Sequence, residues 1–523
     1  MDLCDKYLVD SINVYPPLND TLQYTKFFKK SRILPNHYSK KFNKKSSELD
    51  EKYHKLLTKK KELSFCEKVL KHDLDYDKKL SSFYNSEYLP NINDDVMFMY
   101  YEICMDKLPP LYTKSDYVMM INRLKSMSGI TNDIIGFLEK GIKKKIFLNR
   151  LIVDNFLDKS RTILDDKINP KNVPSELKSK FIKAIDKYLV KNIKKLNDFI
   201  LNTYLPYSIE KIGLCAYAGG KKYYETLCKY ETLPNLTPEI IHQLGISELK
   251  KTLTLKNKLA KKIGCSDIDD YMHTHNKYYT KASDILSDLE AQKQTLYKKM
   301  DKYFFHDIPV LYDIEPISDT NMDMTAYYIG PNKGNKGKGT FYINILHPEK
   351  ISIYELLVLS IHEGIPGHHY DAYITYKSDK PDYIKNTLYS GYAEGWALYC
   401  ESLFEYTNPK EHYYALQYRV ERSLRLIIDT GIHYYGWDYD KCFTYMKKYF
   451  KYESDSFIKD QILRYSSIPG QALTYIIGEQ VILYLKKEYM KKNKDIKSFH
   501  KIILDIGPCP LELLIKQFQE NIF

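Results

Sequence analysis

The feature that most constrains the fold is a buried helical run that has to break between two histidines. Residues 355–376 read ELLVLSIHEGIPGHHYDAYITY, so an apolar stretch leads directly into His362 and Glu363. Pro366 has no N–H for the carbonyl of His362, and its ring collides with that carbonyl in a regular helix. Proline also disfavours α geometry at the residue before it. One straight helix therefore cannot run through this segment.

The spacing of the histidines makes the break chemically informative. In a regular helix His368 would point about 240° round the axis from His362, and His369 would share its face but lie roughly 10 Å further along. Neither could share a tetrahedral ion with His362, because the bonds to such an ion are about 2 Å long. A bulge of two residues would bring His368 back, and a bulge of three would bring back His369. We favour His368 as the second ligand because it needs the smaller distortion, and His369 is the alternative.

A second string, YAEGWALYCE at residues 392–401, supplies the carboxylate of Glu394. Imidazoles and a carboxylate suit a borderline-soft divalent cation such as zinc. Glu363 would project beside the ion, where a carboxylate can act as general base toward water. A structural polar cluster is the alternative, although an unpaired carboxylate among apolar residues is costly. The predicted ligands of one zinc ion are His362, His368 and Glu394.

Composition bears on several other classes of protein. The net charge of +12 comes from 79 basic and 67 acidic residues that are spread thinly along the chain. Solvated helix faces explain the lysine runs better than a nucleic-acid footprint does. Nine cysteines without a C-x-x-C pair argue against a thiolate zinc site or a disulfide framework. The chain start lacks a signal-peptide pattern and no apolar stretch could span a bilayer, so we expect a cytoplasmic protein without membrane or nucleic-acid partners.

Helical periodicity dominates the chain. Charged residues surround a sparse apolar stripe from 47 to 82, and similar patterns recur at 131–158, 173–204, 282–304, 411–435 and 440–450. No repeat or linker marks a clean boundary in the 523 residues. We predict a mainly α protein. Residues 1–45 would form a loosely attached N-terminal extension, and 46–523 one large helical catalytic domain.

One β-prone segment precedes the histidine motif. Residues 324–345 read MTAYYIGPNKGNKGKGTFYINI, two β-prone stretches around a loop rich in Gly, Lys and Asn, which predicts a hairpin. In zinc peptidases a strand edge beside the metal helix often holds an extended peptide through main-chain hydrogen bonds. We therefore expect Tyr342, in the second stretch, to contact substrate. A small covering sheet without a binding role is the alternative.

Two downstream segments add candidate catalytic and substrate-binding residues. His433 lies in IIDTGIHYYGW at 427–437, although a histidine in such a run is more often a core residue. The segment RYSSIPGQALTYIIG begins with Arg464, and after its Pro-Gly break Gln471 and Tyr475 are four residues apart, on one helix face. An oxyanion or a substrate carboxylate needs such donors. A tyrosine on an apolar helix is, however, usually a core residue.

These strings, in this order, resemble the family known as domain of unknown function 885, which is grouped with the zincin-like metallopeptidases. The resemblance covers residues 215–523 well and rests on HEGIPGHH, EGWALY, DTGIH, the R-Y…PGQA…Y segment, GGKKYYETLCKY, GTFYINI and FHKIILDIGPCPLELL. It implies a mainly helical zincin fold of the gluzincin type and the zinc ligands His362, His368 and Glu394. It also implies Glu363 as general base and proton shuttle.

The same resemblance implies that His433 and Tyr475 stabilise an oxyanion and that Arg464 lies near the substrate. Together, these observations predict a zinc-dependent hydrolase, a metallopeptidase that cleaves short peptides. Two alternatives from other classes are a non-catalytic helical binding protein that a metal stabilises, and a basic, nucleic-acid-associated helical scaffold.

Overall fold

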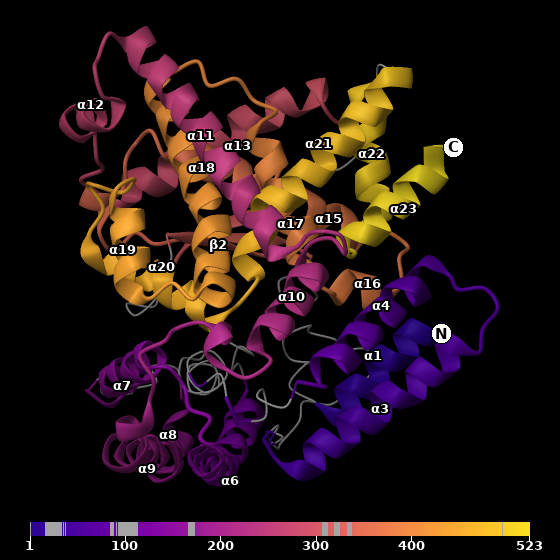
Figure 1. Ribbon diagram of the computed structural model, residues 1–523, viewed down its shortest axis with the longest axis vertical. Coiled ribbons are helices and arrows are strands. Elements are labelled where there is room, and N and C mark those ends of the chain that lie inside the picture. Colours follow the sequence, from indigo (N-terminus) through magenta and orange to yellow (C-terminus); the bar gives the residue numbers. More distant parts are fainter. Residues whose placement is uncertain are drawn as a thin grey trace. The chain divides into compact units, whose positions relative to one another are not determined.

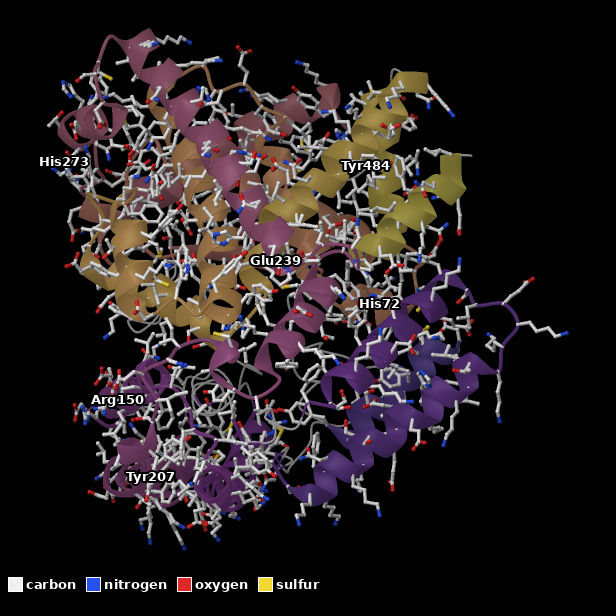
Figure 2. All side chains as sticks on the ribbon, viewed as in Figure 1. His72, Arg150, Tyr207, Glu239, His273 and Tyr484 are labelled. Carbon is white, nitrogen blue, oxygen red and sulfur yellow. The ribbon has the colours of Figure 1, made fainter. Side chains whose placement is uncertain are left out.

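The computed structural model describes residues 2–15, 34, 36, 38–83, 88–89, 92, 113–165, 173–305, 312–317, 325–331, 337–493 and 495–522. The chain divides into two compact units (Figure 1). Unit 1 comprises Met1–Thr226, Ile432–Phe443 and Lys459–Pro469, and unit 2 comprises Leu227–Gly431, Thr444–Ile458 and Gly470–Phe523. The chain therefore leaves unit 1 and returns to it twice. In Figure 2, His72 and Arg150 belong to unit 1, whereas His273 and Tyr484 belong to unit 2.

Unit 1 is helical in its described residues. Its elements before residue 220 are α1 (Leu3–Val14), α3 (Lys40–Thr58), α4 (Phe65–Leu80), α6 (Lys114–Lys144), α7 (Arg150–Asp165), α8 (Ser175–Ala184), η3 (Ile185–Val190), α9 (Lys191–Phe199), η4 (Ile200–Tyr204), η5 (Leu205–Tyr207) and η6 (Leu214–Ala216). Leucine and isoleucine side chains from α6 to α9 form one apolar core. The helical pattern predicted for 47–82 corresponds to parts of two helices, α3 and α4. At the start of α4, Ser64 and Glu67 form a capping box through reciprocal side chain–backbone bonds.

The N-terminal helix is fastened to its neighbours. The Tyr7 hydroxyl donates to Asp50, and Asp10 accepts hydrogen bonds from Lys52 and Tyr53, so side chains of α1 bond along α3. The predicted boundary between residues 45 and 46 falls inside α3, where the helix runs without a break. In the described residues, α1 therefore packs against α3. Residues 16–33 of that extension lie outside the described residues.

Unit 2 contains long helices, short helical turns and the sheet. Its helices are α11 (Pro238–Ile263), α12 (Ile268–His275), α13 (Ala282–Lys299), η7 (Met300–Lys302), η8 (Pro348–Lys350), α14 (Leu356–Leu359), η9 (Ser360–Gly364), α15 (His368–Lys377), α16 (Asp382–Asn386), α17 (Ser390–Glu401), α18 (Pro409–Thr430), η11 (Gln471–Leu473), α21 (Thr474–Lys492), α22 (Ile496–Ile506) and α23 (Leu511–Ile522). The chain crosses from one unit to the other within α10 (Gly220–Glu231), η10 (Gly431–Tyr435), α19 (Tyr439–Lys447) and α20 (Asp455–Ser467), and again shortly after α20.

Two close helix pairs organise unit 2. α11 lies along α18, and α17 lies along α21 (Figure 1). Gly245 of α11 permits the first approach, since a Cβ there would come within 2.8 Å of side-chain atoms of Leu426 and Ile427. The mainly helical character predicted from the sequence is confirmed. No helix in the described part of the chain is both long and apolar enough to cross a membrane.

The small sheet has three strands in the order β1-β3-β2, not the two strands of the predicted hairpin. β1 (Tyr312–Pro316) pairs parallel with β3 (Gly339–Ile343), and β2 (Ala326–Ile329) pairs antiparallel with β3. β3 is therefore the central strand, and both of its edges are occupied. The sheet contacts η9 through β2 and α15 through both β2 and β3.

Candidate metal centre

The helix that carries the first histidine opens just before Pro366, which was expected to break it. α14 widens into the π-helical turn η9, and α15 begins only at His368. Between them the N–H of Gly367 donates to the carbonyl of Ile361 at 2.9 Å. This bond spans six residues, two more than the bond of a regular helix. The predicted bulge of two residues is therefore present, and it returns His368 to the neighbourhood of His362.

Glycine and a tryptophan stabilise this bulge. A Cβ on Gly367 would lie 1.9 Å from the carbonyl oxygen of His362, so only glycine fits where the backbone folds back on itself. The carbonyl of Pro366 is taken up by α17, because it accepts a hydrogen bond from Nε1 of Trp396 at 2.9 Å. Cys400 lies one helical turn further along, and its thiol donates to the same carbonyl at 3.4 Å.

Three side chains converge on one point. Nε2 of His362 lies 3.4 Å from Oε2 of Glu394, and Nε2 of His368 lies 3.5 Å from the same oxygen. The three ligand atoms all lie within 4.8 Å of one another. The two imidazole rings are nearly perpendicular, at 84°. Among the described residues, this is the cluster of histidine, cysteine and acidic side chains whose geometry could hold a metal ion.

The distances and the chemistry of this cluster fit zinc. With bonds of about 2.0–2.1 Å, neighbouring ligand atoms around a tetrahedral zinc ion are separated by about 3.4 Å. The separations of Glu394 from His362 and His368 match that value. Oε2 of Glu394 is buried and accepts no hydrogen bond from a described residue. Two imidazole nitrogens and one carboxylate oxygen form a three-ligand set of the kind found at catalytic zinc sites, which keep a fourth position open.

Glu401, which is not among the site residues predicted from the sequence, lies behind the first histidine. Its Oε1 lies 2.8 Å from Nδ1 of His362, and both side chains are buried. A carboxylate at Nδ1 fixes the proton there and leaves the Nε2 lone pair for a metal. Glu401 comes seven residues after Glu394, two turns along α17, so both carboxylates lie on the same side of that helix.

The charges of the cluster shift the ionisation of its members. Burial lowers the pKa of His362, but the carboxylates of Glu394 and Glu401 outweigh burial and raise that pKa to about 10. Burial raises the pKa of Glu394, but His362 and His368 outweigh it and hold that pKa well below its usual value. Without a metal, positive charge on the His362 imidazole compensates the buried carboxylates. A divalent cation would supply that charge instead.

His369 points away from the cluster. Its Nδ1 lies 2.8 Å from the hydroxyl of Tyr328 on β2, and its ring packs against Tyr312 on β1. A Cβ on Gly339 would overlap the Tyr328 hydroxyl at 1.7 Å, so glycine at the start of β3 makes room for this contact. Burial lowers the pKa of His369 to about 3. Of these two histidines, His368 thus lies with His362 and Glu394.

Glu363 follows His362 directly and is half-buried. It makes no hydrogen bond or ion pair with another residue in the described ranges. The neighbouring Gly364 is confined, because a Cβ there would meet the Tyr312 hydroxyl at 2.5 Å. Within the described ranges, the carboxylate of Glu363 therefore takes part in no structural hydrogen bond or ion pair.

The helix that carries Glu394 crosses α21 at glycines. A Cβ on Gly395 would lie 2.5 Å from Cα of Gly478, and a Cβ on Gly478 would lie 2.0 Å from the carbonyl oxygen of Gly391. No side chain separates the two helices at this crossing. The crossing therefore fixes the position of α17 and of the ligand Glu394 beside Gly395.

The segments DTGIH and PGQA meet at the start of α21. The carboxylate of Asp429 is buried and accepts the N–H of Gly470 at 3.2 Å. Gly470 has a φ of 86°, a left-handed conformation that favours glycine. Gln471 then opens η11, and Tyr475 lies buried in the first turn of α21 with the guanidinium of Arg425 4.2 Å above its ring. Their predicted roles toward substrate stay predictions.

His433 and Arg464 belong to unit 1, whereas His362, His368 and Glu394 belong to unit 2. His433 is buried, its Nδ1 accepts the N–H of Leu214, and its Nε2 donates to the carbonyl of Tyr465 at 2.8 Å. Burial lowers its pKa to about 4, so the ring is neutral. Both ring nitrogens of His433 therefore bond to the backbone, and its predicted catalytic role stays a prediction. Arg464 is half-buried on α20.

Tyr342 lies on the central strand of the sheet. It pairs with Tyr327 of β2 and with Glu315 of β1, and its ring stacks on Tyr327 at 4.9 Å. The predicted hairpin would leave one edge of this strand free, but β1, which was not predicted, covers that edge. The contact of Tyr342 with substrate stays a prediction. β2 lies at an edge of the three-stranded sheet.

The fold and this cluster define a mainly helical protein with a candidate three-ligand metal centre. The chain belongs to the family described as "Bacterial protein of unknown function (DUF885)", whose model matches residues 31–517. The family predicted from the motifs is thereby confirmed, and the match extends well upstream of residue 215. A comparison with curated proteins gave no match.

Two solved structures share the fold. One is a "putative lipoprotein from Colwellia psychrerythraea", with a TM-score of 0.84 and 19% sequence identity, covering 99% of this chain and 98% of that one. The other is a "putative lipoprotein of unknown function from Shewanella oneidensis", with a TM-score of 0.76 and 15% identity, covering 99% of both chains. At these identities the likeness concerns the fold alone.

Proposed function

We propose that this protein is a zinc-dependent hydrolase, a metallopeptidase of the gluzincin type that acts on short peptides. The observation that carries the proposal is the convergence of His362, His368 and Glu394, in which Glu394 lies at tetrahedral spacing from each of the two histidines. The bond from Glu401 to His362 supports it, because such carboxylate–histidine pairs accompany metal ligands. Three ligands favour a catalytic over a structural site, which normally has four.

A bound zinc ion would supply a water of lowered pKa and would polarise the scissile carbonyl. The chain itself supplies the base. Glu363 is adjacent to the first ligand and has no partner among the described residues, so its carboxylate is free to accept a proton from water. It would then pass that proton to the leaving amine. His362, His368 and Glu394 would hold the ion, and Glu401 would hold His362 in the required tautomer.

The substitution Glu363→Gln tests this assignment. It removes the base and leaves the three ligands in place, so peptide hydrolysis should fall by at least about 100-fold, the usual scale of general-base catalysis. The zinc content, measured by atomic spectrometry, should stay at one ion per chain. A peptide library digested with and without zinc and read by mass spectrometry provides the activity assay. Undiminished cleavage by the variant would refute the role of Glu363.

Chelation distinguishes the hydrolase from a helical binding protein that a metal merely stabilises. If the ion is catalytic, a strong chelator should abolish cleavage reversibly, while circular dichroism of the helices stays unchanged. If the ion is structural, its removal should unfold unit 2, because binding free energy of such an ion is folding free energy. Loss of helix on chelation would therefore favour the binding protein.

A further inference from the structure

A buried arginine lies behind the carboxylate that contacts the first histidine. Nη2 of Arg422 donates to Oε1 of Glu401 at 3.3 Å, and the same oxygen lies 2.8 Å from Nδ1 of His362. All three side chains are buried. One carboxylate oxygen therefore joins a buried guanidinium to the imidazole of a candidate metal ligand.

The guanidinium of Arg422 packs against the ring of Tyr418, which lies one turn before it on α18. The ring centroid of Tyr418 lies 4.8 Å from Cζ of Arg422. The hydroxyl of Tyr418 in turn donates to Glu355, the residue that precedes α14 and the histidine turn. One face of α18 thus bonds both to the beginning of the metal-binding segment and, through Arg422, to Glu401.

Arg422 differs in its partners from the other arginines of this helix. In the described part of the chain, Glu401 is the one carboxylate in ion-pair contact with Arg422. Arg419 instead bonds Glu248 and Glu479, and Arg425 bonds Glu421. Any effect of Arg422 on the metal centre should therefore pass through Glu401.

We propose that Arg422 is a positioning residue for the candidate metal centre. By holding Glu401 against Nδ1 of His362, it keeps Nε2 of that ring turned toward Glu394, and so raises the affinity of the site for a divalent cation. The inference rests on the proposed function, since it assumes that the site binds a metal. It also requires that the gain from orientation exceed the repulsion between the guanidinium and the bound cation.

The test is the zinc affinity of the purified protein, measured by competition with a chromophoric chelator. The variants Arg422→Gln and Arg422→Met should bind zinc about 10- to 100-fold more weakly, the range found when partners of metal-ligating histidines are removed. Methionine keeps an aliphatic stem to pack against Tyr418, so it serves if the glutamine variant does not fold. The variant Arg422→Lys should recover part of the affinity.

A double-mutant cycle shows whether Arg422 acts through Glu401. Glu401→Gln alone should weaken zinc binding, and adding Arg422→Gln to it should cause no further loss, because the two residues act in series. The matched control is Arg425→Gln, which breaks a buried ion pair on the same helix without touching Glu401. Its zinc affinity should equal that of the unmodified protein.

Three outcomes would overturn the inference. Unchanged or tighter zinc binding by both the glutamine and methionine variants would show that repulsion cancels or exceeds orientation. Additive losses in the double mutant would show that Arg422 does not act through Glu401. Failure of the unmodified protein to bind zinc would reject the proposed metal centre itself, and this inference with it.

Discussion

Gly395 and Gly478 meet backbone to backbone, since a Cβ built on the first would lie 2.5 Å from Cα of the second. This contact joins the helix that carries the ligand Glu394 to α21. Gly478 is the more confined of the two, because its own Cβ would lie 2.0 Å from the carbonyl oxygen of Gly391. The position of a metal ligand thus depends on the absence of side chains at a helix crossing.

Gly478→Ala should lower the free energy of unfolding by about 1–3 kcal/mol or more, because the added methyl forces the two helices apart. Chemical denaturation monitored by circular dichroism would measure this loss. Gly136→Ala is the matched control, since Gly136 lies in α6 with nothing within 4 Å of an added Cβ. There alanine should be neutral or stabilise by up to about 1 kcal/mol. Equal effects at both sites would contradict the role of the crossing.

His368→Ala should weaken zinc binding by more than the roughly 10- to 100-fold typical of residues that only support a ligand. His369→Gln should leave zinc binding nearly unchanged, because His369 bonds to Tyr328 and points away from Glu394. Titration of both variants with zinc against a competing chelator makes the comparison. The reverse order of affinities would assign the second ligand to His369.

His433 should make the stability of the protein fall in acid. Its pKa is lowered to about 4 in the folded chain, against about 6.5 when unfolded, so below pH 6.5 the unfolded chain binds the extra proton. Stability therefore declines as the pH falls from about 6.5 to about 4, by about 3 kcal/mol in all from this group. Urea denaturation at several pH values should show a shallower decline for His433→Gln. An unchanged slope would contradict a buried neutral imidazole.

Arg419→Met should be among the most destabilising substitutions on α18. The guanidinium of Arg419 pairs with Glu248 and Glu479, both almost fully buried, and its removal leaves two carboxylates without that cation. The expected cost is about 3–5 kcal/mol. Lys251→Ala removes the exposed partner of the same Glu248 and should cost at most about 1 kcal/mol. Thermal denaturation of the two variants would compare them, and similar losses would count against a buried ion pair.

The metal cluster was predictable from sequence because the residues between the two histidines favour a bulge that corrects their irregular spacing. Pro366 removes a helical bond, and Gly367 tolerates the approach of the His362 carbonyl. Glu401 was missed, although a clue existed, since it comes two turns after Glu394 on a buried helix and a buried carboxylate needs a partner. The partner itself, His362, is distant in sequence and could not be inferred.

The third strand of the sheet and the division of the chain into two units could not be inferred from the sequence, and the reason is the same for both. β1 is five residues long and ends in proline, and its parallel pairing with β3 depends on a long connection that local patterns do not encode. Likewise, no local pattern shows that His433 and Arg464 return to unit 1. The roles predicted for these two residues toward substrate stay predictions, because sequence order alone does not show which segments share one site.

The repeated return of the chain to unit 1 has a consequence for synthesis. Unit 1 cannot be completed until the segment ending at Pro469 has left the ribosome, although most of its helices are made first. The early helices must therefore wait, with part of their apolar surface uncovered, while most of unit 2 is translated. Folding of the N-terminal part should consequently depend on chaperones more than its position in the chain would suggest.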